Sequence, residues 1–330
     1  MKSIFTKCKH NIYIEYLFKV LNTLYQIHKQ ESISLFYLYL DYSWCLIRYG
    51  CLINQYYSGN FYKTPRIIRK KAFTQRRLSR IIDKYNDSCY IKYLKDKNLF
   101  NTYFSEFIHR RFLYSETMTF DDFESLYNSS DELFIKPIDD MEGHGIKKIQ
   151  TKLSDSKESF NRLVGQNVLI EECIQQHPSM NLGNSSVNSV RILTALDIYG
   201  HAHILRAGLR VGVGDAVVDN FTAGGVLYQI DIHTGRIDNK GIQGTNYKII
   251  FHPSTDICML GFKVPNWHIA IDSVIKAAEK LPQCRFIGWD VAITTKGVEL
   301  IEGNHNPGIF TMESLGTPGA YADVMKIFNS

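Results

Sequence analysis

Two short apolar stretches near the C-terminus carry oxygen-bearing side chains: Asp290 in the first, and Glu302 and Asn304 in the second. A polar turn ending in Gly297 separates them, which predicts a β-hairpin. With the turn centred on Lys296, Asp290 lies opposite Glu302, and Asn304 shares the face of Glu302. Facing carboxylates about 5 Å apart repel each other unless a cation lies between them. Oxygen ligands favour Mg²⁺ or Mn²⁺ held partly through a substrate's phosphates, whereas the alternative is an ordinary polar hairpin face.

A glycine-containing loop further upstream could cradle a phosphate group. The stretch Leu133–Pro137 predicts a strand that carries Lys136, and a loop with Gly143, His144 and Gly145 follows it. Backbone N–H groups can approach phosphate oxygens where no Cβ intervenes, and the lysine adds a positive charge. The spacing matches neither the Walker A motif nor GxGxxG, so an ordinary hairpin turn explains these residues equally well.

Acidic and basic side chains lie on the next predicted strands. The apolar run Val168–Ile174 contains Glu171 and Glu172, which indicates either a hinge that pairs with adenine or an ordinary strand end. Arg191 and Arg210 lie on two alternating stretches that follow. A guanidinium can bind two oxygens of a phosphate or carboxylate at once. These arginines and the glycine-rich segment after them therefore indicate an anion pocket.

The composition is that of a globular protein with room for two or three subdomains. The chain has 330 residues, of which 45% are hydrophobic and 22% are charged. Its net charge of +5 suits anionic substrates and is too small to indicate nucleic-acid binding. The seven cysteines form no CxxC motif and the N-terminus lacks a signal-peptide layout, so we expect a reduced cytosolic environment.

Helical patterns dominate the N-terminal region. Residues 11–30 place apolar side chains at helical spacing, and residues 33–57 continue as an aromatic-rich helical segment. The run Leu35–Ile53 contains two charged residues, which favours a buried helix over a membrane span. Residues 66–84 hold eight Lys or Arg and one Asp, interleaved with apolar positions. This pattern predicts a basic amphipathic helix, which is either a solvated face or a peripheral contact with an anionic membrane.

In this sequence order the residues resemble the ATP-grasp superfamily over roughly residues 96–310. The closer resemblance is to the sugar-transfer-associated ATP-grasp branch, whose members are usually associated with surface-polysaccharide synthesis. The segments that carry this resemblance are Ser186–Arg191, Asp219–Gly225, His252–Thr255 and Val264–Trp267. The resemblance implies an α+β, ATP-grasp fold in which two α+β subdomains sandwich ATP. We expect a helical N-terminal region over 1–95 that caps the acceptor site, a small lid subdomain over 96–168 and a C-terminal subdomain over 169–330.

The same resemblance implies a role for each candidate residue. Lys97 and Lys136 would contact the nucleotide phosphates beneath the lid loop formed by Gly143, His144 and Gly145. Asp290, Glu302 and Asn304 would hold one or two Mg²⁺ ions. The residues expected at the adenosine are Glu171, Glu172, Cys173 and Ile174, and Asn188 is a further expected cofactor-binding residue. Those expected at the γ-phosphate or acyl-phosphate are Arg191, Arg210 and Asn220.

These implications predict an ATP- and Mg²⁺-dependent (or Mn²⁺-dependent) carboxylate–amine ligase that forms an amide through an acyl-phosphate. The expected substrate is a sugar acid or amino sugar, nucleotide- or lipid-linked, in capsule or O-antigen assembly. The alternatives are a kinase-like phosphotransferase, an amino-acid or peptide ligase unrelated to sugars, and a nucleotide-binding regulatory module. We expect a cytoplasmic protein, with the inner face of the membrane as a second location. His144, His252 and His305 are candidates for the base that accepts the amine's proton.

Overall fold

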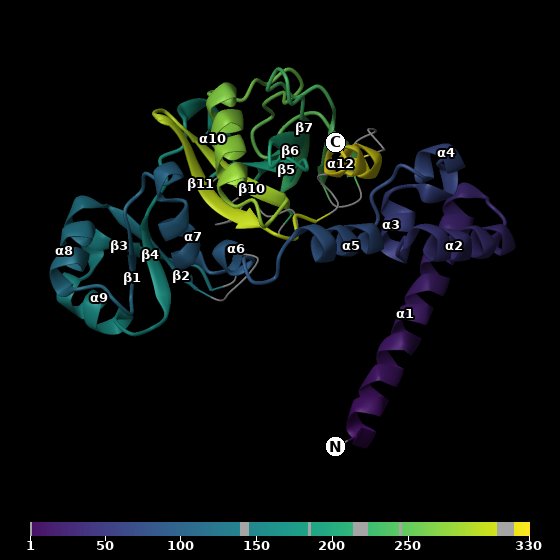
Figure 1. The fold of residues 1–330 in the computed structure, drawn as a ribbon, viewed down its shortest axis with the longest axis horizontal. Coiled ribbons are helices and arrows are strands. Elements are labelled where there is room, and N and C mark those ends of the chain that lie inside the picture. Colours follow the sequence, from purple (N-terminus) through teal and green to yellow (C-terminus); the bar gives the residue numbers. More distant parts are fainter. Residues whose placement is uncertain (1, 139–144, 184–185, 214–223, 244–245, 309–319) are drawn as a thin grey trace.

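The computed structural model describes residues 2–138, 145–183, 186–213, 224–243, 246–308 and 320–330, with side chains from residue 13 onward except at 246–248. Helices form the N-terminal third, and two antiparallel sheets with their covering helices form the rest (Figure 1). This arrangement confirms the expected α+β class. No helix in the described ranges is both long enough and apolar enough to cross a membrane.

The first helices have a core of their own. They are α1 (Lys2–Glu31), α2 (Leu35–Tyr49) and α3 (Ile53–Ser58). Leu24 of α1 and Tyr56 of α3 are buried in one cluster with the inner face of α2. Gly50 ends α2 in the left-handed conformation at φ 67°, which favours glycine. A buried ion pair joins Arg69 Nη1 to Asp41 Oδ1 at 2.7 Å, so polar contacts as well as packing position α2.

The prediction of one basic helix over residues 66–84 is wrong. The stretch folds as α4 (Arg66–Arg69) and α5 (Gln75–Tyr85), with Lys70–Thr74 between them. Phe73 and Leu78 are buried in a cluster with Phe286, which belongs to the larger sheet. Because both side chains are buried in the core, this stretch does not present them to a membrane.

A buried asparagine connects α5 to the larger sheet. Asn86, just after α5, donates from Nδ2 to the carbonyl of Phe286 at 2.8 Å and accepts at Oδ1 from its N–H at 2.9 Å. This pairing mimics that of a strand. Two short helices, α6 (Lys92–Lys95) and α7 (Lys97–Tyr103), then lead into the smaller sheet.

The smaller sheet has the strand order β1-β4-β2-β3. Its strands are β1 (Phe112–Tyr114), β2 (Glu132–Pro137), β3 (Lys147–Gln150) and β4 (Val168–Glu172), and its helices are α8 (Phe120–Ser129) and α9 (Ser156–Leu163). Thr119 and Asp155 cap the two helices by accepting from backbone N–H groups of the first turn. The expected subdomain boundary between residues 168 and 169 falls inside β4. This strand pairs with β2 of the smaller sheet from Val168 to Glu172, so all of β4 belongs to that sheet.

The larger sheet has the order β11-β10-β5-β6-β7-β8-β9. Its strands are β5 (Ser189–Leu196), β6 (Ala202–Val211), β7 (Val226–Ile230), β8 (Gly241–Gln243), β9 (Asn246–Ile249), β10 (Phe286–Thr294) and β11 (Gly297–Asn304). Trp289 packs with α10 (Trp267–Lys280) on one face, and Phe286 packs with α12 (Ala320–Phe328) on the other. Side chains alternate along β10, so Asp290 shares the face of Phe286 further along the strand.

Candidate active site

Asp290 and Glu302 are cross-strand partners on β10 and β11, as predicted, although the turn pairs Thr294 with Gly297 and is not centred on Lys296. The register then shifts after Asp290, so that Ala292 pairs with Glu299. Asp290 and Ala292 lie on one face of β10, and cross-strand partners share a face. Glu302 and Glu299 therefore lie on the same face of β11, although they are three positions apart, an odd spacing that places side chains on opposite faces of a regular strand. The β-bulge changes the phase of the strand and adds Glu299 to the polar face.

Two arginines neutralise Asp290, whose exposed fraction is 1%. Arg191 on β5 binds both carboxylate oxygens, Oδ1 through Nε and Oδ2 through Nη2 at 2.8 Å. Arg210 on β6 donates from Nη2 to Oδ2 at 2.7 Å and to Ser189 Oγ at 2.8 Å. Burial alone would raise the pKa of Asp290, but the two guanidinium charges hold that pKa well below its usual range. The structure thus brings three of the predicted residues together as one ion-paired cluster.

Glu302 is the more accessible acid of the pair. Desolvation by the surrounding protein raises its pKa, and the adjacent charge of Asp290 raises it further. The residue as a whole is nevertheless exposed. Asn304 Nδ2 donates to Glu302 Oε1 at 3.0 Å, so these two residues of the predicted metal site contact each other. A cation beside this pair would lower the pKa of Glu302 and relieve the repulsion.

The chemistry of these donors fits a hard divalent cation such as Mg²⁺, because all three side chains offer oxygen. Among the residues that the structure describes, no three His, Cys, Asp or Glu side chains form a metal-binding group. A cation at this site would therefore need the Asn304 amide and oxygens from a substrate. Both oxygens of Asp290 accept from arginines, so we expect a cation to approach from the Glu302 side.

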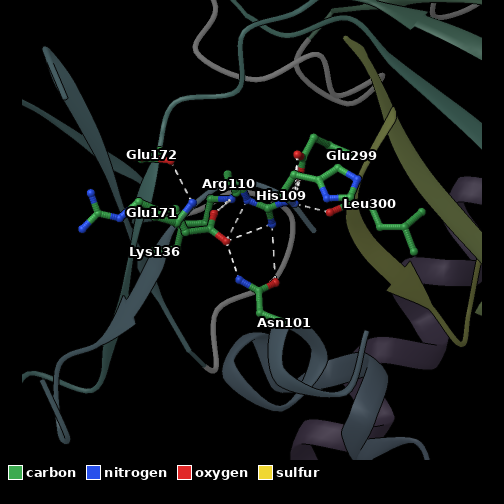
Figure 2. Close-up of polar contacts among 9 residues, drawn as sticks. Asn101, His109, Arg110, Lys136, Glu171, Glu172, Glu299 and Leu300 are labelled. Carbon is green, nitrogen blue, oxygen red and sulfur yellow. Dashed lines mark hydrogen bonds and ion pairs between the residues drawn. The ribbon is translucent and has the colours of Figure 1, made fainter. Parts of the chain in front are cut away.

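A second buried cluster surrounds Glu171 of β4 (Figure 2). Lys136 of β2 forms an ion pair with Oε2, while Oε1 accepts from Asn101 Nδ2 at 2.7 Å and from Arg110 Nη2 at 2.9 Å. Burial alone would raise the pKa of Glu171, but the charges of Arg110 and Lys136 hold it well below its usual range. The Glu171 side chain is only 1% exposed, so it is enclosed by protein and serves to position Lys136. An ammonium has three N–H donors, so Lys136 can hold this contact and bind phosphate as well.

Arg110 connects this cluster to the larger sheet. Its Nη1 donates to Glu299 Oε2 at 3.2 Å and to the carbonyl of Leu300 at 2.8 Å. Glu299 also accepts from the backbone N–H of His109 at 2.9 Å. Figure 2 shows Arg110 between Glu171 on one side and Glu299 on the other.

Sequence reasoning missed Asn101, Arg110 and Glu299. None of them stands in a recognisable motif, and strict alternation along β11 places Glu299 on the face opposite to Glu302. Buried ion-pair partners come from segments far apart in the chain. The one available signal was the pair of basic residues Arg110-Arg111, which directly precede the stretch that folds as β1.

The predicted adenine hinge begins where β4 ends. Glu172 Oε2 accepts from the backbone N–H of Arg111 at 2.8 Å. Cys173 and Ile174 follow beyond the last paired residue of β4, and both are half-buried. Burial raises the pKa of Cys173 to about 11, so its thiol is protonated at neutral pH.

Two other predicted residues contact backbone groups. Lys97, the first residue of α7, donates to the carbonyl of Pro137 at 2.7 Å, at the end of β2. Asn188 is buried; its Nδ2 donates to the carbonyl of Met180 at 2.7 Å and its Oδ1 accepts from Gly212 N–H at 3.1 Å. In this structure Lys97 lies beside the strand that carries Lys136, and Asn188 connects two loops.

The histidines differ in their access. His252 is buried, and its Nδ1 accepts from the N–H of Ser254, which leaves Nε2 to donate to the carbonyl of Gly212. Because both ring nitrogens are engaged, His252 is not placed to take a proton from a substrate. His305 is half-buried beyond β11, and burial lowers its pKa.

Of the remaining predicted residues, Gly145 is exposed at φ 71°, whereas Gly143, His144 and Asn220 lie outside the described residues.

Several solved structures are similar to this chain. They include the L-amino acid ligase from Bacillus licheniformis, 15% identical with a TM-score of 0.44, over 72% of this chain and 48% of that chain. The ATP-grasp ligase PsnB, complexed with a phosphomimetic variant of its minimal precursor, Mg and ADP, is 14% identical with a TM-score of 0.43. The match covers 73% of this chain and 61% of that chain. N5-carboxyaminoimidazole ribonucleotide synthetase from Thermus thermophilus is 11% identical with a TM-score of 0.46. The match covers 76% of this chain and 57% of that chain.

The chain spans about half to three fifths of the length of these structures. No curated protein sequence matches it. The family profile described as sugar-transfer associated ATP-grasp matches residues 76–327, which include both sheets and both buried clusters. The protein belongs to the sugar-transfer associated ATP-grasp family.

Proposed function

We propose that this protein is an ATP- and Mg²⁺-dependent ligase that joins a carboxylate to an amine. One observation carries the proposal: Arg191, Arg210, Asp290 and Glu302 gather on one face of the larger sheet, with Asn304 beside them. Such a face combines charge for phosphate oxygens with oxygen donors for a cation. Membership of an ATP-grasp family supports the use of ATP.

The first step would transfer the γ-phosphoryl group of ATP to the substrate carboxylate, which gives ADP and an acyl-phosphate. Such transfers depend on alignment and charge neutralisation more than on covalent help from the protein. Arg191 and Arg210 each have five N–H donors, so they can retain Asp290 and bind phosphoryl oxygens. Asp290, Glu302 and Asn304 would hold Mg²⁺, which would supply further positive charge to those oxygens. In the second step the amine attacks the acyl carbon, phosphate leaves, and the amine loses a proton.

The smaller sheet would hold the nucleotide. Lys136, fixed by Glu171, would bind phosphate oxygens together with Lys97. The main chain of Cys173 and Ile174 would pair with adenine. Glu172, which is half-buried, is the better candidate for the ribose hydroxyls, because the side chain of Glu171 is enclosed.

The sugar substrate rests on the family's association with sugar transfer. We propose a sugar acid or an amino sugar in surface-polysaccharide assembly, and therefore a cytoplasmic location. Mass spectrometry of the surface polysaccharide from cells with and without this protein would identify both substrates. Loss of an amide-linked substituent is the expected result, and an unchanged polysaccharide contradicts the sugar assignment.

A ligase and a kinase on this scaffold differ in the fate of phosphate. We would incubate the protein with ATP, Mg²⁺, amines and sugar acids that carry ¹⁸O in the carboxylate. The ligase releases ADP and free phosphate containing ¹⁸O, and it forms an amide. Phosphate retained on the acceptor would instead indicate a phosphotransferase.

Two further alternatives separate in the same assay. Amide formation with amino acids but not with sugars would indicate an amino-acid or peptide ligase. A nucleotide-binding module would bind ATP but release no ADP in this assay, and its function in cells would tolerate Glu302→Gln, whereas the proposed ligase loses its activity in this variant. The matched variant Glu15→Gln, on an exposed position of α1, should leave activity unchanged.

A further inference from the structure

The outer face of α2 is apolar and exposed. Phe36, Leu40, Trp44 and Ile47 follow one another at helical spacing and are 73%, 52%, 49% and 76% exposed. The opposite face of α2 packs on α1 and α3 in the N-terminal core. The helix is thus apolar on both sides, although only one side is covered. A contiguous exposed patch of this kind marks an interaction surface.

Positive charge borders this patch. The Arg66 guanidinium lies 5.9 Å from the ring centre of Trp44, which places α4 and its 67%-exposed Ile67 beside the outer face of α2. Lys70 and Lys71 follow α4 and are exposed. We call the outer face of α2 together with Arg66–Lys71 the α2–α4 face.

The charge of the chain is divided unevenly. Residues 1–84 contain 15 Lys or Arg and 4 Asp or Glu, whereas residues 85–330 contain 23 and 29. In Figure 1, α2 and α4 lie at the end of the molecule opposite to the smaller sheet. The α2–α4 face therefore lies away from the smaller sheet, which is the part of the molecule proposed to hold the nucleotide.

We propose that the α2–α4 face binds an anionic lipid surface. Aromatic side chains such as Phe36 and Trp44 insert at the boundary between headgroups and acyl chains, and the flanking Lys and Arg attract anionic headgroups. The interaction is peripheral, because α2 lies along the surface.

A second copy of the chain fits this face less well. A two-fold dimer would bring the same face of each copy together. The cations at Arg66, Lys70 and Lys71 would then oppose like charges, whereas an anionic bilayer neutralises them.

Vesicle binding tests the proposal with the full chain and without ATP, so a failure here is distinct from a failure of the ligase reaction. We expect the protein to sediment with vesicles of equal parts phosphatidylglycerol and phosphatidylcholine, and at least about tenfold less with phosphatidylcholine alone. The triple variant Phe36→Ser/Trp44→Ser/Ile47→Ser should reduce binding by more than about tenfold. The matched control is Ile198→Ser/Tyr199→Ser, at an exposed turn between β5 and β6.

The electrostatic part has its own pair of variants. Lys70→Glu/Lys71→Glu should weaken binding by about fivefold or more for each cation removed. Lys157→Glu/Lys276→Glu makes the same change in net charge at other exposed positions and should have a smaller effect. Equal effects from the two pairs would overturn the assignment to this face.

Tryptophan fluorescence reports contact in the unmodified protein. Trp44 is exposed, whereas Trp267 and Trp289 are 7% and 0% exposed. We expect anionic vesicles to shift the emission to shorter wavelength and brominated lipids to quench it, and Trp44→Phe to remove both responses. Absence of vesicle binding overturns the proposal. A dimer in sedimentation velocity that the triple variant dissociates also overturns it, in favour of a second copy on this face.

Discussion

Glu171 and Glu299 belong to different sheets, yet both accept hydrogen bonds from one guanidinium, that of Arg110. Glu171 also forms an ion pair with Lys136, and Glu299 lies on the same face of β11 as Glu302. The side chain that positions the proposed phosphate-binding lysine is thus joined through Arg110 to the strand of the proposed metal site. The two halves of the site are held together by charge as well as by packing.

Arg110→Met should destabilise the protein by about 3–5 kcal/mol, because two buried carboxylates would lose their shared partner. Urea unfolding followed by circular dichroism measures the change. Arg111→Met is the matched control; that side chain is exposed and donates to the hydroxyls of Ser125 and Ser129, so we expect a change below about 1 kcal/mol. Equal unfolding midpoints for the two variants would contradict the bridging role.

The lowered pKa of Glu171 predicts that the free energy of unfolding decreases in acid. Its pKa is lowered in the folded state, so its contribution is fully present above the unfolded value of about 4.3 and is lost as the pH falls through the folded value. We expect the free energy of unfolding to decline below about pH 4. Glu171→Gln should flatten this decline and cost stability at neutral pH. The exposed substitution Glu15→Gln should leave the pH profile as it is, and a profile unaltered by Glu171→Gln would exclude the ion-paired state.

The two glutamates of β11 should respond in opposite ways. The pKa of Glu302 is raised, so its ionised form disfavours folding as the pH rises through that value. Glu302→Gln should therefore raise the melting temperature by about 1–3 °C in the absence of Mg²⁺ while abolishing turnover. Glu299→Gln should lower the melting temperature, because Glu299 accepts from Arg110 and from His109 N–H. Thermal unfolding with and without Mg²⁺-ATP measures both; stabilisation by Mg²⁺-ATP that is equal in Glu302→Gln and the unmodified protein would argue against the metal site.

Arg210 and Arg206 lie on the same face of β6 but should differ in function. Arg210 contacts Asp290, whereas Arg206 contacts Asp323 of α12. Arg210→Gln should lower kcat by about 10²–10³-fold, as expected for a group that stabilises transferring phosphoryl charge. Arg206→Gln should leave kcat within about threefold. Steady-state release of ADP measures both, and a similar loss in the two variants would place the effect in the fold of β6.

The hairpin was predictable because its information is local. Two apolar runs flank a short polar turn, which is enough to predict the hairpin. The turn pairs Thr294 with Gly297 and is not centred on Lys296, so a regular register would place Ile301 opposite Asp290. The β-bulge after Asp290 produces the predicted pairing with Glu302. The amphipathic helices α10 and α12 likewise follow from local information, since 3.6-residue periodicity is a property of neighbouring residues. Their packing partners on the two faces of the sheet do not.

By itself, the sequence determined the family, the α+β class and the order of the candidate residues along the chain. Only the tertiary structure decided that Arg191 and Arg210 both bind Asp290, and that Arg110 joins Glu171 to Glu299. It also decided that a bulge turns Glu299 onto the face of Glu302. The physical reason is that local patterns specify elements, whereas a buried charge takes its partner from whatever segment the fold brings within hydrogen-bonding distance.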